Sequence, residues 1–132
     1  MKLPVINYIS KEEYCGAVNI YKIIDAEISY PYAYFELNSI KYYLAYSSCE
    51  PVKAEIFFIE EKNYLLIGVD FKVVVISTVS GTILLSLGLY SFFKGFRNNN
   101  DLSFTILSEL EDIIINKNGL SISQIVSHDL EF

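Results

Sequence analysis

The feature that most constrains this chain is an apolar stretch, residues 64–87, which returns in diluted form at residues 104–126. In each copy, apolar runs rich in β-branched residues alternate with polar or glycine-containing segments, a pattern typical of strands and turns. Both copies therefore predict strand, turn, strand, turn, strand. The aligned segments are Tyr64–Ile67 with Phe104–Leu107, Val73–Val75 with Ile113–Ile115 and, after a two-residue deletion, Ser80–Thr82 with Asn118–Leu120.

A repeat of this length and pattern resembles a blade of a β-propeller, a small antiparallel sheet that does not bury both of its faces alone. Two blades are too few to close a propeller, since propellers typically contain about four to eight of them. Each predicted sheet therefore needs another cover for its open face. This cover could be the N-terminal strands, the other repeat or a second chain. We expect the strands of residues 20–60 to form this cover, because their apolar faces are similar in size to those of the repeats.

The N-terminal half of the chain predicts a short helix followed by strands. A serine followed by two glutamates at residues 10–13 is typical of the N-capped start of a helix, here a brief one. Residues 24–30 alternate between apolar and polar side chains, as in a half-buried strand. Residues 33–37 and 40–46 alternate in the same way on either side of Asn38-Ser39, which predicts an antiparallel hairpin.

At 132 residues, the chain has the size of one domain and is expected to bury roughly two-thirds of the surface that its unfolded form exposes. Its 11 Tyr and 9 Phe residues add to the preference for strands. We therefore predict a mainly β fold, with antiparallel sheets packed as a sandwich or partial barrel, two blade-like repeats and at most one or two short helices. This single domain spans residues 1–132, with N-terminal strands at 20–60 and the repeats at 64–87 and 104–126.

Residues 73–93 carry no charged side chain and are long enough to cross a bilayer as a helix. Two observations argue against a membrane span. The first part of the segment is dominated by β-branched residues, and Ser80-Gly81 falls where a hairpin would turn. The second copy aligns with the same region but contains Lys117 between two asparagines, which are costly inside a membrane. The interpretation that we favour is a sheet buried on both faces.

The composition argues against several classes of function. The formal net charge is −6, with 10 basic and 16 acidic side chains, whereas nucleic-acid binding requires a basic face. A basic protein is the complementary partner. Two cysteines, Cys15 and Cys49, are too few for a secreted disulfide scaffold, and residues 1–4 lack the apolar run of a signal peptide. We therefore expect a cytoplasmic protein with free thiols.

No pattern in the sequence predicts a catalytic, cofactor or metal site. The glycines are isolated, so no phosphate-binding loop is present. One histidine and two distant cysteines do not make a metal site, and the carboxylates at residues 101–112 lack EF-hand spacing. His128 beside Asp129 suggests a general base, but neighbours in sequence point to different sides of a strand. We expect a protein that is not an enzyme and uses no cofactor.

Two surface features are candidates for binding a partner. Residues 101–132 contain six acidic side chains and one lysine, which form either a solvated face or a docking surface for a basic partner. Tyrosines cluster at residues 30–46, where exposed rings suit an interface and buried rings suit the core; Tyr42 and Tyr46 are expected to face the core. The predicted partner-binding residues are Asp101, Glu109, Glu111, Asp112, Asp129, Tyr32 and Tyr43.

A small, acidic, strand-rich domain with an aromatic surface and no catalytic motif resembles the immunity proteins that accompany bacterial polymorphic and contact-dependent toxins. The resemblance lies in the general character of the whole chain and in the blade-like units of residues 64–126, without a diagnostic motif. It implies a protein that binds a cognate toxin domain, often a basic nuclease, and occludes its active site. The competing hypothesis is a small-molecule-binding β-barrel or sandwich without enzymatic activity, which predicts an internal cavity and no protein partner.

Overall fold

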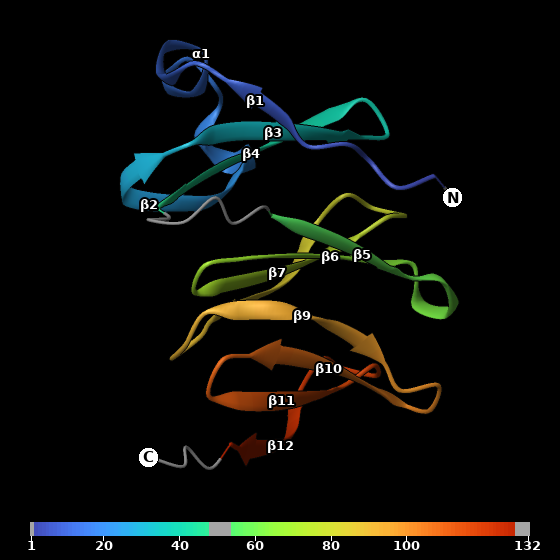
Figure 1. Ribbon diagram of the computed structural model, residues 1–132. Helices are drawn as coiled ribbons and strands as arrows, with labels where there is room; N and C mark the ends of the chain where they lie inside the picture. The colour runs from blue at the N-terminus through green and yellow to red at the C-terminus, as the bar shows by residue number, and fades with distance from the viewer. Residues whose placement is uncertain (1, 48–53, 129–132) are drawn as a thin grey trace.

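The computed structural model describes residues 2–47 and 54–128, which form three four-stranded sheets stacked on one another (Figure 1). We call them the N-terminal, middle and C-terminal sheets, because each is built from one continuous part of the chain. In Figure 1 they follow one another from top to bottom in chain order. The mainly β, sandwich-like fold predicted from the sequence is confirmed.

The N-terminal sheet has the strand order β1-β3-β4-β2. The predicted hairpin is β3 and β4, and its turn residues Asn38 and Ser39 have φ angles of 51° and 67°. Two positive φ angles are typical of the type I′ turn, whose twist matches that of a hairpin. Strand β2 pairs in parallel with β4, which departs from the purely antiparallel sheets that we predicted. The strands are β1 (Asn7–Ile9), β2 (Lys22–Tyr30), β3 (Tyr32–Leu37) and β4 (Ile40–Ser47).

The predicted short helix is α1 (Lys11–Cys15), which lies against the outer face of the N-terminal sheet (Figure 1). The Oγ atom of Ser10 caps it by accepting a hydrogen bond from a backbone N–H of the first turn at 3.2 Å. Tyr14 is buried, and its ring centroid lies 5.1 Å from that of Tyr32 and 6.4 Å from that of Tyr43. Since so short a helix is marginal alone, this packing holds it in place. Two 3-10 turns, η1 (Asn19–Tyr21) and η2 (Glu60–Lys62), precede β2 and β6.

The middle and C-terminal sheets contain the two predicted repeats, each preceded by one further strand. Both are antiparallel meanders, in the orders β5-β6-β7-β8 and β9-β10-β11-β12. A β-bulge interrupts the last pair of each sheet, next to Val75 in one and Ile114 in the other. Residues 97–98 are polar but belong to the end of β9, because they pair with β10. The strands are β5 (Glu55–Ile59), β6 (Tyr64–Val69), β7 (Lys72–Ser77), β8 (Ile83–Gly88), β9 (Phe93–Asn98), β10 (Ser103–Ser108), β11 (Glu111–Asn116) and β12 (Ile122–Ser127).

Two hydrophobic cores lie on the two faces of the middle sheet. Successive side chains along β6 and β7 point to opposite faces. Leu65 and Ile67 pack against the N-terminal sheet, whereas Leu66, Val73 and Val75 pack against the C-terminal sheet. All five side chains are fully buried, so the inner strands of this sheet are covered on both faces, as we predicted. Within the described residues, no helix has the length and apolar character needed to cross a membrane.

Both of the covers that the chain itself supplies are used. The N-terminal sheet packs on one face of the middle sheet, as we expected. The C-terminal sheet packs on the other face, so the two repeats also stack on each other through Phe96, Phe104 and Ile106. Strands β8 and β12 are edge strands of the middle and C-terminal sheets, and each has one hydrogen-bonded neighbour in the described part of the chain.

Gly68 marks a close approach between the middle and C-terminal sheets. A Cβ atom at this position would lie 2.7 Å from Cε2 of Phe93, well inside van der Waals contact. We expect Gly68→Ala to destabilise the protein by about 1–3 kcal/mol, the usual cost of overpacking a core. Urea unfolding measures this change. Gly88→Ala is the matched control, because a Cβ atom there would meet nothing within 4 Å; equal losses in the two variants would contradict the prediction.

Candidate functional site

Three connections between strands meet at one end of the middle and C-terminal sheets. The β8–β9 loop lies between the β6–β7 turn and the β10–β11 turn and is hydrogen-bonded to both. The backbone N–H of Leu89 donates to the carbonyl of Phe71 at 2.7 Å, and the N–H of Glu109 donates to the carbonyl of Phe92 at 2.8 Å. We call this end the turn face; it comprises Phe71, Tyr90, Phe92, Glu109, Leu110, Glu111 and Asp112.

The centre of the turn face is an exposed aromatic patch. Tyr90 is 90% exposed, and Phe71 and Phe92 are each 46% exposed. The rings of Phe71 and Phe92 pack together with centroids 4.5 Å apart, and Leu110 adds a further exposed apolar side chain. Exposed aromatic rings that are fixed by a rigid scaffold are enriched at protein interfaces, where they supply much of the binding energy.

Carboxylates border the aromatic patch on the side of the C-terminal sheet. Glu109 is exposed in the β10–β11 turn, and Glu111 and Asp112 begin β11. Asp112 accepts a hydrogen bond from Nε2 of His128 at 2.8 Å across the β11–β12 pair. The Oε1 atom of Glu111 is buried and accepts no hydrogen bond from the part of the chain that the structure describes. This border gives the patch a negative charge on one side.

Among the sequence-predicted site residues, Glu109, Glu111 and Asp112 are brought together at the turn face. Asp101 lies before β10 rather than after it, so a six-residue strand of roughly 20 Å separates it from Glu109. Asp129 lies outside the described residues. The acidic residues of the last quarter of the chain therefore do not form one continuous surface among the residues that the structure describes.

The carboxylate of Asp101 is engaged within its own loop. It accepts hydrogen bonds from the backbone N–H and the Oγ of Ser103 at 2.7 and 2.8 Å. These bonds lower the pKa of Asp101 below its usual range. Its backbone carbonyl accepts a hydrogen bond from Nζ of Lys117 at 2.8 Å. In this arrangement Asp101 stabilises the β9–β10 loop.

The two predicted interface tyrosines lie on the N-terminal sheet, on the face that α1 covers, and are not part of the turn face. Tyr32 and Tyr43 are half-buried, because the ring of Tyr14 from α1 packs on both. Tyr42 and Tyr46 are each 1% exposed, which confirms that they face the core.

Sequence reasoning missed the aromatic part of the turn face. Residues 89–92, which include Tyr90 and Phe92, form a loop between β8 and β9. In the alignment of the two repeats, residues 69–72 and 109–112 are equivalent turns. This equivalence is the sequence signal that could have predicted the turn face, because equivalent turns of stacked blades lie at the same end of the sheets. It did not reveal that the loop brings Phe92 against Phe71.

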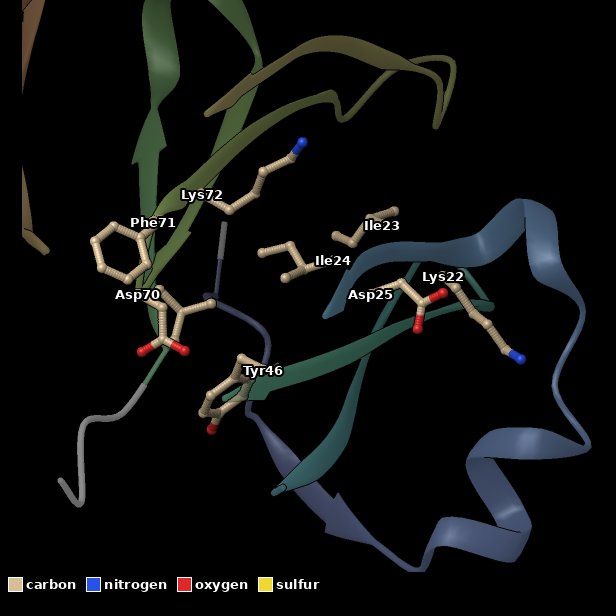
Figure 2. Close-up of a pocket in the computed structure, with 9 residues that line it drawn as sticks. Lys22, Ile23, Ile24, Asp25, Tyr46, Asp70, Phe71 and Lys72 are labelled. Carbon is tan, nitrogen blue, oxygen red and sulfur yellow. The ribbon is translucent and has the colours of Figure 1, made fainter. Parts of the chain in front are cut away.

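A cleft of about 530 Å³ lies between the N-terminal and middle sheets (Figure 2). Figure 2 shows residues of β2 on one side of it and Asp70, Phe71 and Lys72 on the other. Its lining includes Ile24, Tyr46 and Phe71, together with two aspartates and two lysines. Asp25 lines the cleft and accepts a hydrogen bond from the hydroxyl of Tyr14. Burial is the larger cause and this hydrogen bond the smaller cause of the raised pKa of Tyr14. Because Phe71 belongs to both features, the cleft adjoins the turn face.

The described residues show no further arrangement typical of a reactive site. Over residues 2–47 and 54–128, no three His, Cys, Asp or Glu side chains are grouped closely enough to hold a metal ion. Cys15 is an exposed free thiol, and Cys49 lies outside the described residues. Comparisons of this chain with protein-family models, with curated proteins and with solved structures find no match.

Proposed function

We propose that this protein is an immunity protein that binds a cognate toxin domain and occludes its active site. What supports the proposal most directly is the turn face, where exposed aromatic rings are bordered by Glu109, Glu111 and Asp112. Aromatic anchors surrounded by charged groups of one sign are typical of interfaces in which the rings supply affinity and the charges supply orientation and association rate.

A basic nuclease is the partner whose chemistry fits this surface best. Such an enzyme presents lysine and arginine side chains that bind phosphate groups. Carboxylates at the turn face take the place of those phosphates, and the rings of Phe71, Tyr90 and Phe92 cover the surrounding surface. The proposal places the protein in the cytoplasm, where a nuclease would meet its substrate.

Co-purification of the tagged protein with the product of the neighbouring upstream gene tests the proposal. We expect a complex with one toxin domain per chain that silences the toxic activity, measured by calorimetric titration and by a nuclease assay. Its association rate should fall as salt is raised, because complementary charges steer the encounter. A protein that neither binds nor inhibits that product would contradict the proposal.

The cleft between the N-terminal and middle sheets supports a second candidate function, the binding of a small molecule. Its volume of about 530 Å³ is within the range of ligand sites, and Ile23, Ile24 and Val69 give it an apolar floor. A ligand of this cleft would raise the melting temperature of the isolated protein in proportion to its affinity and concentration. A screen of small apolar molecules that leaves the melting temperature unchanged would remove this candidate.

A further inference from the structure

Glu109 is the carboxylate of the turn face that is open to a ligand. Its side chain is exposed, and its carboxylate makes no hydrogen bond or ion pair with the residues that the structure describes. By contrast, Asp112 accepts a hydrogen bond from His128, and the Oε1 atom of Glu111 is buried. A basic group that approaches the turn face therefore meets Glu109 without having to displace another group.

Glu109 lies directly opposite Phe92. The pairing of β9 with β10 places Ser108 opposite Phe93. The backbone N–H of Glu109 donates to the carbonyl of Phe92 at 2.8 Å, which extends this antiparallel pairing by one residue. Opposite residues of an antiparallel pair point to the same side and have Cβ atoms about 4.5–5.5 Å apart. The carboxylate of Glu109 therefore lies beside the ring of Phe92.

Exposed aromatic rings adjoin this carboxylate. The rings of Phe92 and Phe71 pack together at an angle of 32°, and about half of each side chain is exposed. Tyr90, in the same loop as Phe92, is almost fully exposed. A cation within about 6 Å of the centre of an aromatic ring is attracted to its face. The turn face therefore offers both a carboxylate and aromatic rings to the same cationic group.

Two buried serines hold the aromatic loop to the acidic turn. The hydroxyl of Ser91 donates to Oγ of Ser108 at 3.0 Å and accepts from the backbone N–H of Leu110 at 3.0 Å. The hydroxyl of Ser108 donates in turn to the carbonyl of Glu111 at 2.6 Å. Ser91 and Ser108 are 5% and 1% exposed, so these bonds are shielded from water. The rings and the carboxylate are therefore preorganised, which lowers the entropy cost of binding.

We propose that the turn face binds an arginine side chain of its partner, with the guanidinium stacked on the ring of Phe92 and hydrogen-bonded to Glu109. A guanidinium is planar, is more weakly hydrated than an ammonium group, and donates hydrogen bonds in a fork that matches a carboxylate. The ammonium group of lysine is a compact and strongly hydrated charge, which suits the carboxylate but not the rings. The inference rests on the proposed function in one respect, that a toxin domain supplies this arginine from the groups with which it binds phosphate.

Titration of the free protein with N-acetyl-arginine amide tests the proposal, with the NMR chemical shifts of the backbone amides as the measurement. We expect this probe to shift the amides of residues 90–92 and 109–111. Its apparent affinity should be about threefold or more above that of N-acetyl-lysine amide, because the guanidinium also stacks on the rings. N-acetyl-citrulline amide, which has the shape of the arginine probe without its charge, should bind more weakly than the arginine probe.

Two variants separate the contribution of the ring from that of the charge. Phe92→Leu keeps an apolar side chain but removes the ring, so it should abolish the preference for arginine over lysine. Glu109→Gln keeps the shape of the side chain but removes the charge, so it should lower the affinity for the arginine probe by about threefold or more. Glu36→Gln, at an exposed position of β3 outside the turn face, is the matched control and should bind the probe as the wild type does. Unchanged melting temperatures should show that all three variants are folded.

Several results would overturn the proposal. These are equal affinities for the arginine and lysine probes, no shifts at the turn face, and wild-type behaviour of Phe92→Leu or Glu109→Gln. Because no toxin domain is present in this titration, such results overturn the arginine site and leave the immunity function standing. The immunity function fails separately, if the product of the upstream gene is neither bound nor inhibited.

Discussion

Replacing Glu109, Glu111 and Asp112 with lysine is expected to weaken the complex with a basic toxin domain by about a thousandfold. Close charge pairs across an interface contribute on the order of 1.5 kcal/mol or more each, and three reversed charges add repulsion to that loss. The domain should stay folded, because the contact between Asp112 and His128 is partly exposed and even a charged pair at such a position contributes about 1 kcal/mol at most. Calorimetric titration measures the affinity, and thermal unfolding measures the stability.

The matched control reverses the same number of charges away from the turn face. Glu12, Glu36 and Glu60 are exposed on α1, β3 and η2, and their replacement with lysine changes the net charge by the same amount. If the toxin domain binds at the turn face, this control variant should retain most of the affinity for it. The main effect of the control should be a slower association rate. Equal effects of the two triple variants would show a general charge effect, and unchanged affinity in the first would remove the turn face as the docking site.

Lys117→Met is expected to destabilise the protein by about 2–3 kcal/mol, because the variant removes a buried charged donor whose hydrogen bonds each contribute about 1.5–3 kcal/mol, and it leaves Asn98 Oδ1 and the Asp101 carbonyl without this donor. Lys117 is 2% exposed, although the sequence suggests a lone surface lysine in an acidic region. Its Nζ atom donates to Oε1 of Glu61 at 2.6 Å, to Oδ1 of Asn98 at 2.7 Å and to the carbonyl of Asp101 at 2.8 Å. These three bonds join η2 of the middle sheet to the loops of the C-terminal sheet.

Methionine keeps the length of the buried stem and removes the ammonium group, so the variant isolates the polar contacts of Lys117 from its packing. Urea unfolding measures the free energy. Lys94→Met, at an exposed position of β9, is the matched control and should change it by no more than about 0.5 kcal/mol. A loss below about 1 kcal/mol for Lys117→Met would contradict the role that we assign to these contacts.

The same contacts make stability depend on pH. The hydrogen bond from Lys117, with smaller contributions from neighbouring groups, lowers the pKa of Glu61 from 4.5 to about 2. A carboxyl group whose pKa is lower in the folded state stabilises that state above its unfolded pKa and loses this contribution as the pH falls through the folded value. Unfolding at a series of pH values should therefore show wild-type stability falling between pH 4.5 and 2 more steeply than that of Lys117→Met.

Part of the candidate site could be predicted because its charges are adjacent in sequence. Glu109, Glu111 and Asp112 lie within one turn and the strand that follows it, so the chain itself holds them together. Asp101 was grouped with them by sequence proximity, but β10 carries it to the opposite end of the sheet. Phe71 and Phe92 were not predicted as a pair, because the stacking of two separate sheets brings their rings together.

Local pattern determined the secondary structure of this protein, and tertiary stacking determined its surfaces. The period-two alternation of the strands and the Asn38-Ser39 turn are properties of neighbouring residues, so the sequence alone predicts the hairpin and both repeats. The burial of Lys117 and the exposure of β8 depend on which sheets pack together and at which edge they stop. Both properties depend on long-range contacts between segments whose sequences do not indicate that they will pack together. Only the tertiary structure therefore determines them.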